Sequence, residues 1–198
     1  MLNIPEAVIK QFNSVLGSDF VRTNSVELSL YSCDGLRLHT ADPGCVVLPK
    51  TTNEIAEIVK ICDAYSLPFV ARGAGTGLSG GAIIDGGVII QLSCMNRILE
   101  IDIPNRCAIV QPGVVNAHLT QEVKSLGYHF APDPSSQIAS TIGGNLAENS
   151  GGPHTLKYGV TVNHILGQTV ILPDGEKIEI GGKYRYISEP DLNCIFTG

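Results

Sequence analysis

A strand, a helix and a second strand follow one another between residues 45 and 71, and this run constrains the fold more than any other part of the chain. Residues 45–48 read Cys-Val-Val-Leu and residues 68–71 read Pro-Phe-Val-Ala, which are two short buried strands. Between them, residues 51–54 read Thr-Thr-Asn-Glu, typical of a capping box that begins a helix reaching about Ser66. This order predicts a βαβ unit with parallel strands.

Helices and hairpins are predicted elsewhere in the chain. Apolar periodicity indicates two further helices, residues 4–16 and residues 116–126, the second capped by Asn116. Paired apolar runs around short turns indicate two hairpins, residues 98–103 with 106–111 and residues 165–172 with 177–180. Parallel and antiparallel pairs in one chain predict an α+β fold.

A glycine-rich loop comes directly after the second strand. Residues 72–81 read Arg-Gly-Ala-Gly-Thr-Gly-Leu-Ser-Gly-Gly, and a loop of this kind can turn its main-chain N–H groups towards an anion because no Cβ blocks the approach. A phosphate or a diphosphate is the natural occupant. The loop lacks the Gly-Lys-Ser/Thr of a Walker motif, and no helical periodicity follows it, as a Rossmann fingerprint requires. By itself it is either a ligand cradle or a flexible turn.

A second long loop, residues 131–159, is rich in glycine, proline and small polar residues and shows almost no periodicity. It contains Thr-Ile-Gly-Gly-Asn at residues 141–145 and Asn-Ser-Gly-Gly at residues 149–152. Two such loops offer many small donors and little bulk, which favours a large, flat cofactor that carries a diphosphate. The alternative is a pair of mobile surface loops.

Charge and cysteine content exclude several classes of protein. A net charge of −6 argues against a nucleic-acid partner, because such domains usually present a basic face. The six cysteines show no zinc-like spacing, so we expect packed, reduced thiols and no metal site. No apolar run approaches the ~20 residues of a membrane span, and we expect a cytoplasmic protein that is membrane-associated only through partner subunits.

Histidines give weaker signals than the glycine loops. His129 lies just before residues 131–159 and His154 lies within them, which makes these two histidines the candidates for a base that faces a substrate. The sequence assigns no catalytic residue.

The motif strings together resemble a known family. PKTTNEIAEIVKICDAYSLPFVARGAGTGLSGGA, APDPSSQIASTIGGNLAENSGGPHTLKYGVT and ILPDG are similar to the FAD-binding (PCMH-type) domain of the vanillyl-alcohol-oxidase/p-cresol-methylhydroxylase superfamily. The closest branch contains the glycolate oxidase D-subunit, D-lactate dehydrogenase and D-2-hydroxyglutarate dehydrogenase.

The resemblance implies a two-subdomain PCMH-type fold, with a small βαβ subdomain and a larger mixed, mainly antiparallel sheet with flanking helices, and FAD extended between them. It implies that residues 72–81 hold the diphosphate and that residues of the second loop line the ribityl chain and flavin. The cofactor-binding residues expected on this basis are Arg72, Gly73, Ala74, Gly75, Thr76, Gly77, Leu78, Ser79, Gly80, Gly81, Pro132, Asp133, Ser135, Thr141, Gly143, Gly144, Asn145, Asn149, Ser150, Gly151, Gly152, Tyr158 and Gly159.

The resemblance also implies a chemistry: hydride transfer from the carbinol carbon of a D-2-hydroxy acid to flavin N5, in a complete enzyme with partner oxidase subunits that include an iron–sulfur protein. Relatives with covalent flavin carry a histidine at the position of Thr76, so we expect non-covalent FAD. Residues 1–40 are expected to be an N-terminal helical or irregular segment and residues 41–198 the FAD-binding domain, truncated before a C-terminal substrate domain and inactive by itself.

Two alternatives remain at this point. One is an enzyme of the same fold and another chemistry, such as the reductase that makes UDP-N-acetylmuramic acid, against which the PDPSS and LKYG strings argue. The other is a non-catalytic flavin-binding or scaffold fragment of a multi-subunit oxidase.

Overall fold

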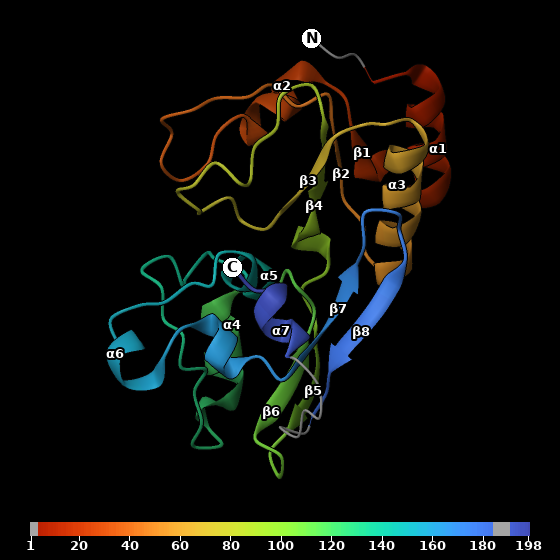
Figure 1. Cartoon of the computed structure of the whole chain (residues 1–198). Helices are drawn as coiled ribbons and strands as arrows, with labels where there is room; N and C mark the ends of the chain where they lie inside the picture. Colours follow the sequence, from red (N-terminus) through yellow and green to blue (C-terminus); the bar gives the residue numbers. More distant parts are fainter. Residues whose placement is uncertain (1–3, 184–190) are drawn as a thin grey trace. The chain divides into compact units, whose positions relative to one another are not determined.

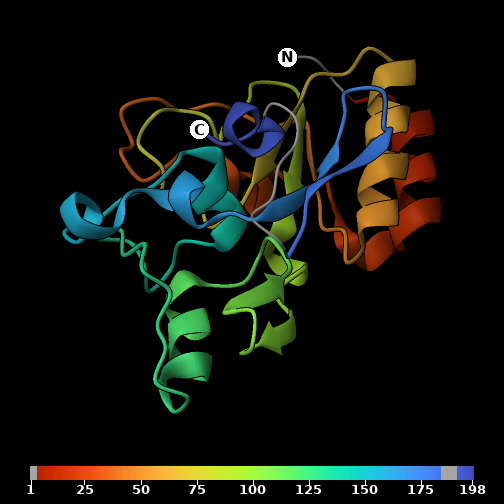
Figure 2. The ribbon, with the colours of Figure 1, turned by 60° about the horizontal axis from the view of Figure 1, so that its bottom comes forward.

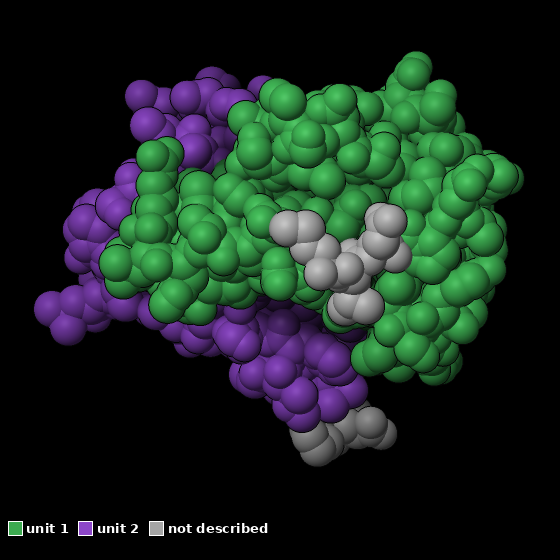
Figure 3. All heavy atoms as spheres, turned by 90° about the horizontal axis from the view of Figure 1, so that it is seen from above, with its two compact units in different colours: residues 1–95, 171–177 green, residues 96–170, 178–198 purple. Residues whose placement is uncertain are grey.

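The computed structural model describes residues 4–183 and 191–198, which divide into two compact units (Figure 3). Unit 1 runs to Met95 and also includes Ile171–Lys177, whereas unit 2 consists of Asn96–Val170 and Ile178–Gly198. The division falls within the hairpin of β7 (Gly167–Ile171) and β8 (Lys177–Gly181), whose tip belongs to unit 1.

Unit 1 is built on a four-stranded sheet with the order β1-β2-β4-β3 (Figure 1). The strands are β1 (Val21–Arg22), β2 (Cys45–Val47), β3 (Phe69–Arg72) and β4 (Val88–Gln91). The predicted strands β2 and β3 are both parallel to β4, which lies between them, and β1 is antiparallel to β2. The βαβ prediction is therefore confirmed, with the strand that follows the glycine loop inserted in the middle.

Two helices, α1 (Glu6–Leu16) and α3 (Thr52–Ala64), lie side by side against this sheet (Figures 1 and 2). The predicted capping box is present, because Thr51 Oγ1 accepts from the Glu54 N–H at 3.2 Å and Glu54 accepts from the Thr51 N–H at 3.1 Å. The apolar faces of both helices and the sheet form one core: Ile4, Val8, Phe12, Val21, Cys45, Val47, Ile58, Val59, Cys62, Val88 and Ile90. Shorter helical turns in unit 1 are Ser18–Phe20, α2 (Ser25–Leu28), Ser29–Tyr31 and Leu92–Cys94.

Both predicted hairpins are present: that of β5 (Ile98–Asp102) and β6 (Cys107–Val110) lies within unit 2, and β7–β8 is divided between the two units. Together with the parallel strands of unit 1 they confirm the α+β class. The antiparallel pair β5–β6 packs on α4 (Asn116–Lys124), with Val114, Leu119, Val123 and Ile142 buried between them. Within the described residues, β5–β6 and β7–β8 are separate two-stranded sheets and do not form one larger sheet. Further short helices are α5 (Ile142–Ala147), α6 (Thr155–Tyr158), a 3₁₀ turn at Thr161–His164 and α7 (Leu192–Ile195).

The Lys183 ammonium, which follows β8, is bound to β5. It forms an ion pair with Asp102 at 2.9 Å and another with Glu100.

Two details differ from the sequence analysis. Asn116 does not cap α4, because its side chain is buried and donates from Nδ2 to the Pro132 carbonyl at 2.9 Å. Residues 131–159 are not one loop, since they contain α5 and α6, which are too short to produce a readable periodicity.

All six cysteines are free thiols, but they differ in packing. Cys45 and Cys62 are buried in the core of unit 1, whereas Cys194 is exposed, contrary to the expected packing. In the part of the chain that the structure describes, no helix is both long and apolar enough to cross a bilayer.

Candidate functional site

The glycine loop leaves β3 and runs without regular structure through residues 73–81, with positive φ at Gly75 (68°) and Gly80 (79°). Within the described residues, five successive main-chain N–H groups donate to no acceptor; these belong to Ala74, Gly75, Thr76, Gly77 and Leu78. A run of unused donors is what an anion requires from a protein backbone.

The guanidinium of Arg72 lies inside this loop. Nη1 donates to the Ala82 carbonyl at 2.9 Å and Nη2 donates to the Cys33 carbonyl at 3.0 Å, so the side chain joins both ends of the loop to the segment before β2. Burial lowers the pKa of Arg72, and Cys33, Tyr31 and Asp34 oppose that shift. An arginine still stays charged, which places a positive charge beneath the loop.

The segment before β2 contacts the loop a second time, through Asp34 and Gly35. Asp34 Oδ2 accepts from the Gly80 N–H at 3.0 Å, and the Gly35 N–H donates to the Gly77 carbonyl at 3.0 Å. Sequence reasoning missed both residues, because an Asp-Gly pair indicates only a turn.

Gln91, at the end of β4, also supports the loop and was not predicted. Its Nε2 donates to the Gly73 carbonyl at 2.9 Å, and its Oε1 is buried without a partner in the described residues.

In unit 2, Asp133 of the segment 132–136 lies against Gly152, the last residue of the segment 149–152. A Cβ on Gly152 would overlap the Asp133 carbonyl, so this approach requires glycine. The Asp133 carboxylate also forms a hydrogen bond with Nδ1 of His154. The structure thus brings together two of the segments that were expected to line the cofactor.

The Thr-Ile-Gly-Gly-Asn segment forms the start of α5. Thr141 caps this helix by accepting from the Gly144 N–H at 3.2 Å. Asn145 is 1% exposed, and its Nδ2 has no partner within the described residues. Leaving a buried amide donor without an acceptor costs free energy, so this Nδ2 is a candidate donor to a ligand.

Several of the remaining expected residues of unit 2 contact other parts of the chain. Asn149 Oδ1 accepts from the Val162 N–H at 3.0 Å, and the Ser150 carbonyl accepts from the Thr161 hydroxyl at 2.7 Å. Tyr158 has the rings of His129 and His154 beside it, at centroid distances of 5.9 and 6.4 Å. His129 and His154, the two histidines that the sequence analysis considered as bases, therefore both lie beside Tyr158. Ser135, another expected site residue, is exposed.

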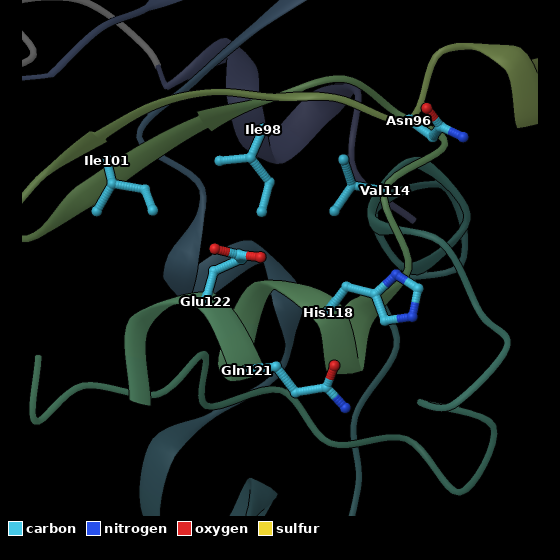
Figure 4. A pocket seen from close by; sticks show the side chains of 7 residues that line it. All are labelled: Asn96, Ile98, Ile101, Val114, His118, Gln121 and Glu122. Carbon is cyan, nitrogen blue, oxygen red and sulfur yellow. The ribbon is translucent and has the colours of Figure 1, made fainter. Parts of the chain in front are cut away.

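Unit 2 also has a hollow of about 720 Å³ beside α4 (Figure 4). Side chains of α4, β5 and the segments next to β5 and β6 line it: Asn96, Ile98, Ile101, Val114, His118, Gln121 and Glu122. None of these residues is an expected cofactor ligand, so we do not assign the hollow to the site.

Residues 43–181 match the family described as FAD binding domain. The chain belongs to this family. This chain is 44% identical to the glycolate oxidase subunit GlcD of Escherichia coli K12 over 185 residues, which are 93% of this chain and 37% of that protein. It is 33% identical to the D-2-hydroxyglutarate dehydrogenase of Stutzerimonas stutzeri, over 97% of this chain and 42% of that protein. The chain thus spans about two fifths of each relative's length.

Solved structures confirm the fold and the resemblance to the p-cresol-methylhydroxylase superfamily. The 4-ethylphenol oxidase of Gulosibacter chungangensis superposes with a TM-score of 0.82 at 26% identity, over 96% of this chain and 39% of that one. The p-cresol methylhydroxylase structure superposes with a TM-score of 0.77 at 25% identity, over 96% of this chain and 40% of that one.

The residues of the FAD-binding domain fit the cofactor that the family name implies. FAD carries a diphosphate, and the loop 74–78 presents unused N–H donors to an anion. FAD also carries many polar acceptors on its flavin and ribityl parts, and Asn145 Nδ2 is a buried donor without a partner within the described residues. A Cβ on Gly80 would meet no atom of the described residues within 4 Å, so this side of the loop has room for a ligand.

Proposed function

We propose that this chain binds FAD non-covalently as the FAD-binding domain of a flavin-dependent D-2-hydroxy-acid dehydrogenase or oxidase of the glycolate or D-lactate type. The observation that carries the proposal is the run of N–H groups from Ala74 to Leu78, which donate to no acceptor within the described residues. These donors would hold the diphosphate, with the buried Arg72 charge beneath them.

The residues of unit 2 would hold the flavin end. Asn145 would donate its unpaired Nδ2 hydrogens to a cofactor oxygen or nitrogen. Residues of four segments between positions 132 and 159 would line the ribityl chain and flavin: Pro132, Asp133, Ser135, Thr141, Gly143, Gly144, Asn149, Ser150, Gly151, Gly152, Tyr158 and Gly159. Residues 41–198 would form this domain, and residues 1–40 would precede it.

Non-covalent attachment is supported by Thr76, because a hydroxyl stands where an imidazole would be needed to bond a flavin. Bound FAD would supply a hydride acceptor, flavin N5, for the carbinol carbon of a 2-hydroxy acid. The part of this chain would be to bind and orient the cofactor.

The names of the relatives support the substrate class and the existence of partner subunits. One is named a subunit of glycolate oxidase and another a D-2-hydroxyglutarate dehydrogenase. We propose a small 2-hydroxy acid as substrate of the complete enzyme, partner oxidase subunits that include an iron–sulfur protein, and a cytoplasmic location with membrane association through those subunits.

Anaerobic mixing of the FAD-loaded chain with glycolate, D-lactate or D-2-hydroxyglutarate tests the activity. We expect the flavin to stay oxidised in this chain and to be bleached rapidly by one of the three acids in a protein of the relatives' full length. Residues 131–159 contain one lysine and no arginine, too few cations to clamp a carboxylate in two places. Absence of bleaching in the full-length protein with all three acids would contradict the proposed substrate class.

A further inference from the structure

The glycine loop is braced by residues that lie before the family match. That match begins at residue 43, whereas Asp34 and Gly35 make two hydrogen bonds to the loop from further back in the chain. Gly35 lies very close to the loop, because a Cβ at this position would be 2.7 Å from the Thr76 carbonyl oxygen.

Asp34 is a buried carboxylate with both oxygens in use. It is 7% exposed, Oδ1 accepts from the N–H groups of Leu36 and Arg37 at 3.0 and 3.1 Å, and Oδ2 accepts from Gly80. The Arg37 N–H lowers the pKa of Asp34 most, burial opposes this shift, and the Gly80 and Leu36 N–H groups add to the lowering. The carboxylate is therefore ionised at neutral pH.

Arg72 braces the same loop from inside. Its two hydrogen bonds end on Cys33 and Ala82, so one side chain connects the residue next to Asp34 with the far end of the loop. Opposite charges on Asp34 and Arg72 attract, and Asp34 raises the pKa of the arginine. The Arg72 donors that reach these two carbonyls are not available to a phosphate.

We propose that Asp34 and Arg72 are positioning residues for the diphosphate of FAD. They hold the loop in the conformation that leaves the N–H groups of residues 74–78 unpaired, and the cofactor touches the main chain of the loop, not these two side chains. This inference rests on the proposed function.

Asp34→Asn tests the proposal by the sign of its effect. The substitution removes a negative charge near an anion site, so through-space electrostatics alone would make FAD and ADP bind more tightly. The positioning role predicts weaker binding, because an amide has one acceptor oxygen and its NH₂ would face either the Gly80 N–H or the N–H groups of Leu36 and Arg37, so one of the two links that fix this segment and the loop is lost. We expect the Kd for FAD and ADP to rise at least about tenfold.

Asp85→Asn is the matched control. It makes the same change in charge and size on an exposed aspartate of unit 1, which accepts from the Asp42 N–H at 3.2 Å. We expect its Kd for FAD to stay within about threefold of the parent value. The ratio of ADP to adenosine affinity should fall in Asp34→Asn, because only ADP carries a diphosphate, and a general loss of stability would not change that ratio.

Arg72→Lys is a second, independent test of the positioning role. A lysine can still serve a phosphate as a point charge, but it cannot reach both the Cys33 and Ala82 carbonyls as the planar guanidinium does. The positioning role predicts a loss of FAD affinity of at least about tenfold, whereas a direct phosphate contact predicts a loss below about threefold.

The outcomes separate this proposal from the proposed function. If the parent chain does not bind FAD, the proposed function fails. If the parent binds FAD and Asp34→Asn binds it equally or more tightly, or Arg72→Lys keeps its affinity, the positioning role is overturned. If circular dichroism shows that Asp34→Asn does not fold, the FAD affinity of Arg72→Lys tests the positioning role by itself. If neither variant folds, both residues serve the fold itself and the proposal is also overturned.

Discussion

Gly143 packs so closely on Pro112 that a Cβ at position 143 would lie 2.6 Å from Pro112 Cβ, whereas a Cβ on the adjacent Gly144 would meet, among the described residues, a single atom, Thr141 Oγ1, at 3.2 Å. Two neighbouring glycines of one segment therefore have different reasons to lack a side chain. Gly143 allows α5 to approach the segment after β6, and Gly144 leaves a face of α5 uncovered.

Gly143→Ala and Gly144→Ala should accordingly differ. Overpacking against Pro112 should lower the free energy of unfolding of Gly143→Ala by ~1–3 kcal/mol without FAD. Gly144→Ala should change that free energy by less than ~1 kcal/mol, since alanine is a better helix former. If FAD lies against this face, Gly144→Ala should still raise the Kd for FAD at least about tenfold. Chemical denaturation and FAD titration measure the two effects, and unchanged FAD affinity in Gly144→Ala would remove this residue from the site.

Gly175 provides a stability control in the tip of the β7–β8 hairpin. Its φ is +83°, and a Cβ there would lie 2.8 Å from the Ala56 carbonyl of α3. Gly175→Ala should cost at least ~1–2 kcal/mol of stability, because both the backbone conformation and the contact oppose a side chain. Its Kd for FAD, measured where the variant is fully folded, should equal that of the parent; a tenfold rise would show that general destabilisation imitates a site defect.

The Lys183 ion pairs should give unit 2 a pH-dependent stability. A side-chain hydrogen bond from Asn105 and another from Lys183 lower the pKa of Asp102 from 3.8 to about 2. Because the pKa of Asp102 is lower in the folded protein than in the unfolded chain, its carboxylate stabilises the fold above pH 3.8, and this stabilisation is lost as the pH falls towards 2. The carboxylates raise the pKa of Lys183, so its contribution is lost only at strongly alkaline pH.

Urea unfolding of the parent and of Lys183→Met measures this effect. The difference between their midpoints should be constant from about pH 5 to 9 and should shrink below about pH 4. A difference that stays the same at about pH 3 would show that the contribution of Lys183 is not electrostatic.

Thiol reactivity should separate the cysteines. Burial raises the pKa of Cys45 and of Cys62 to about 12, so neither thiol forms the reactive thiolate at neutral pH in the folded protein. Cys194 is exposed, although the hydrogen bond to Asp191 raises its pKa. A disulfide reagent at neutral pH should modify Cys194 before Cys45 and Cys62, which should react only on unfolding; peptide mapping that finds either core cysteine modified first would contradict this packing.

The sequence predicts this fold where the signals are local. The capping box of α3, the turn of each hairpin and the glycine loop after β3 are each encoded within a few successive residues. The insertion of β4 between β2 and β3 and the two-residue strand β1 were missed, because strand order depends on pairing between distant segments.

The site was predictable to the same extent. The glycine segments were visible as motifs. The hydrogen bond between Asp34 and the glycine loop was not, since Asp34 and Gly80 are 46 positions apart. Asn116 shows the same limit: an asparagine at the start of a helix indicates a cap, and only the folded chain brings its amide to Pro132.

Titration of the purified, flavin-free chain with FAD is the most direct test of the proposed cofactor site. We expect saturation at one FAD per chain, an increase in the thermal unfolding midpoint with excess FAD, and complete release of the flavin into the filtrate after denaturation. If the folded chain neither quenches flavin fluorescence nor gains thermal stability with excess FAD, it does not bind this cofactor.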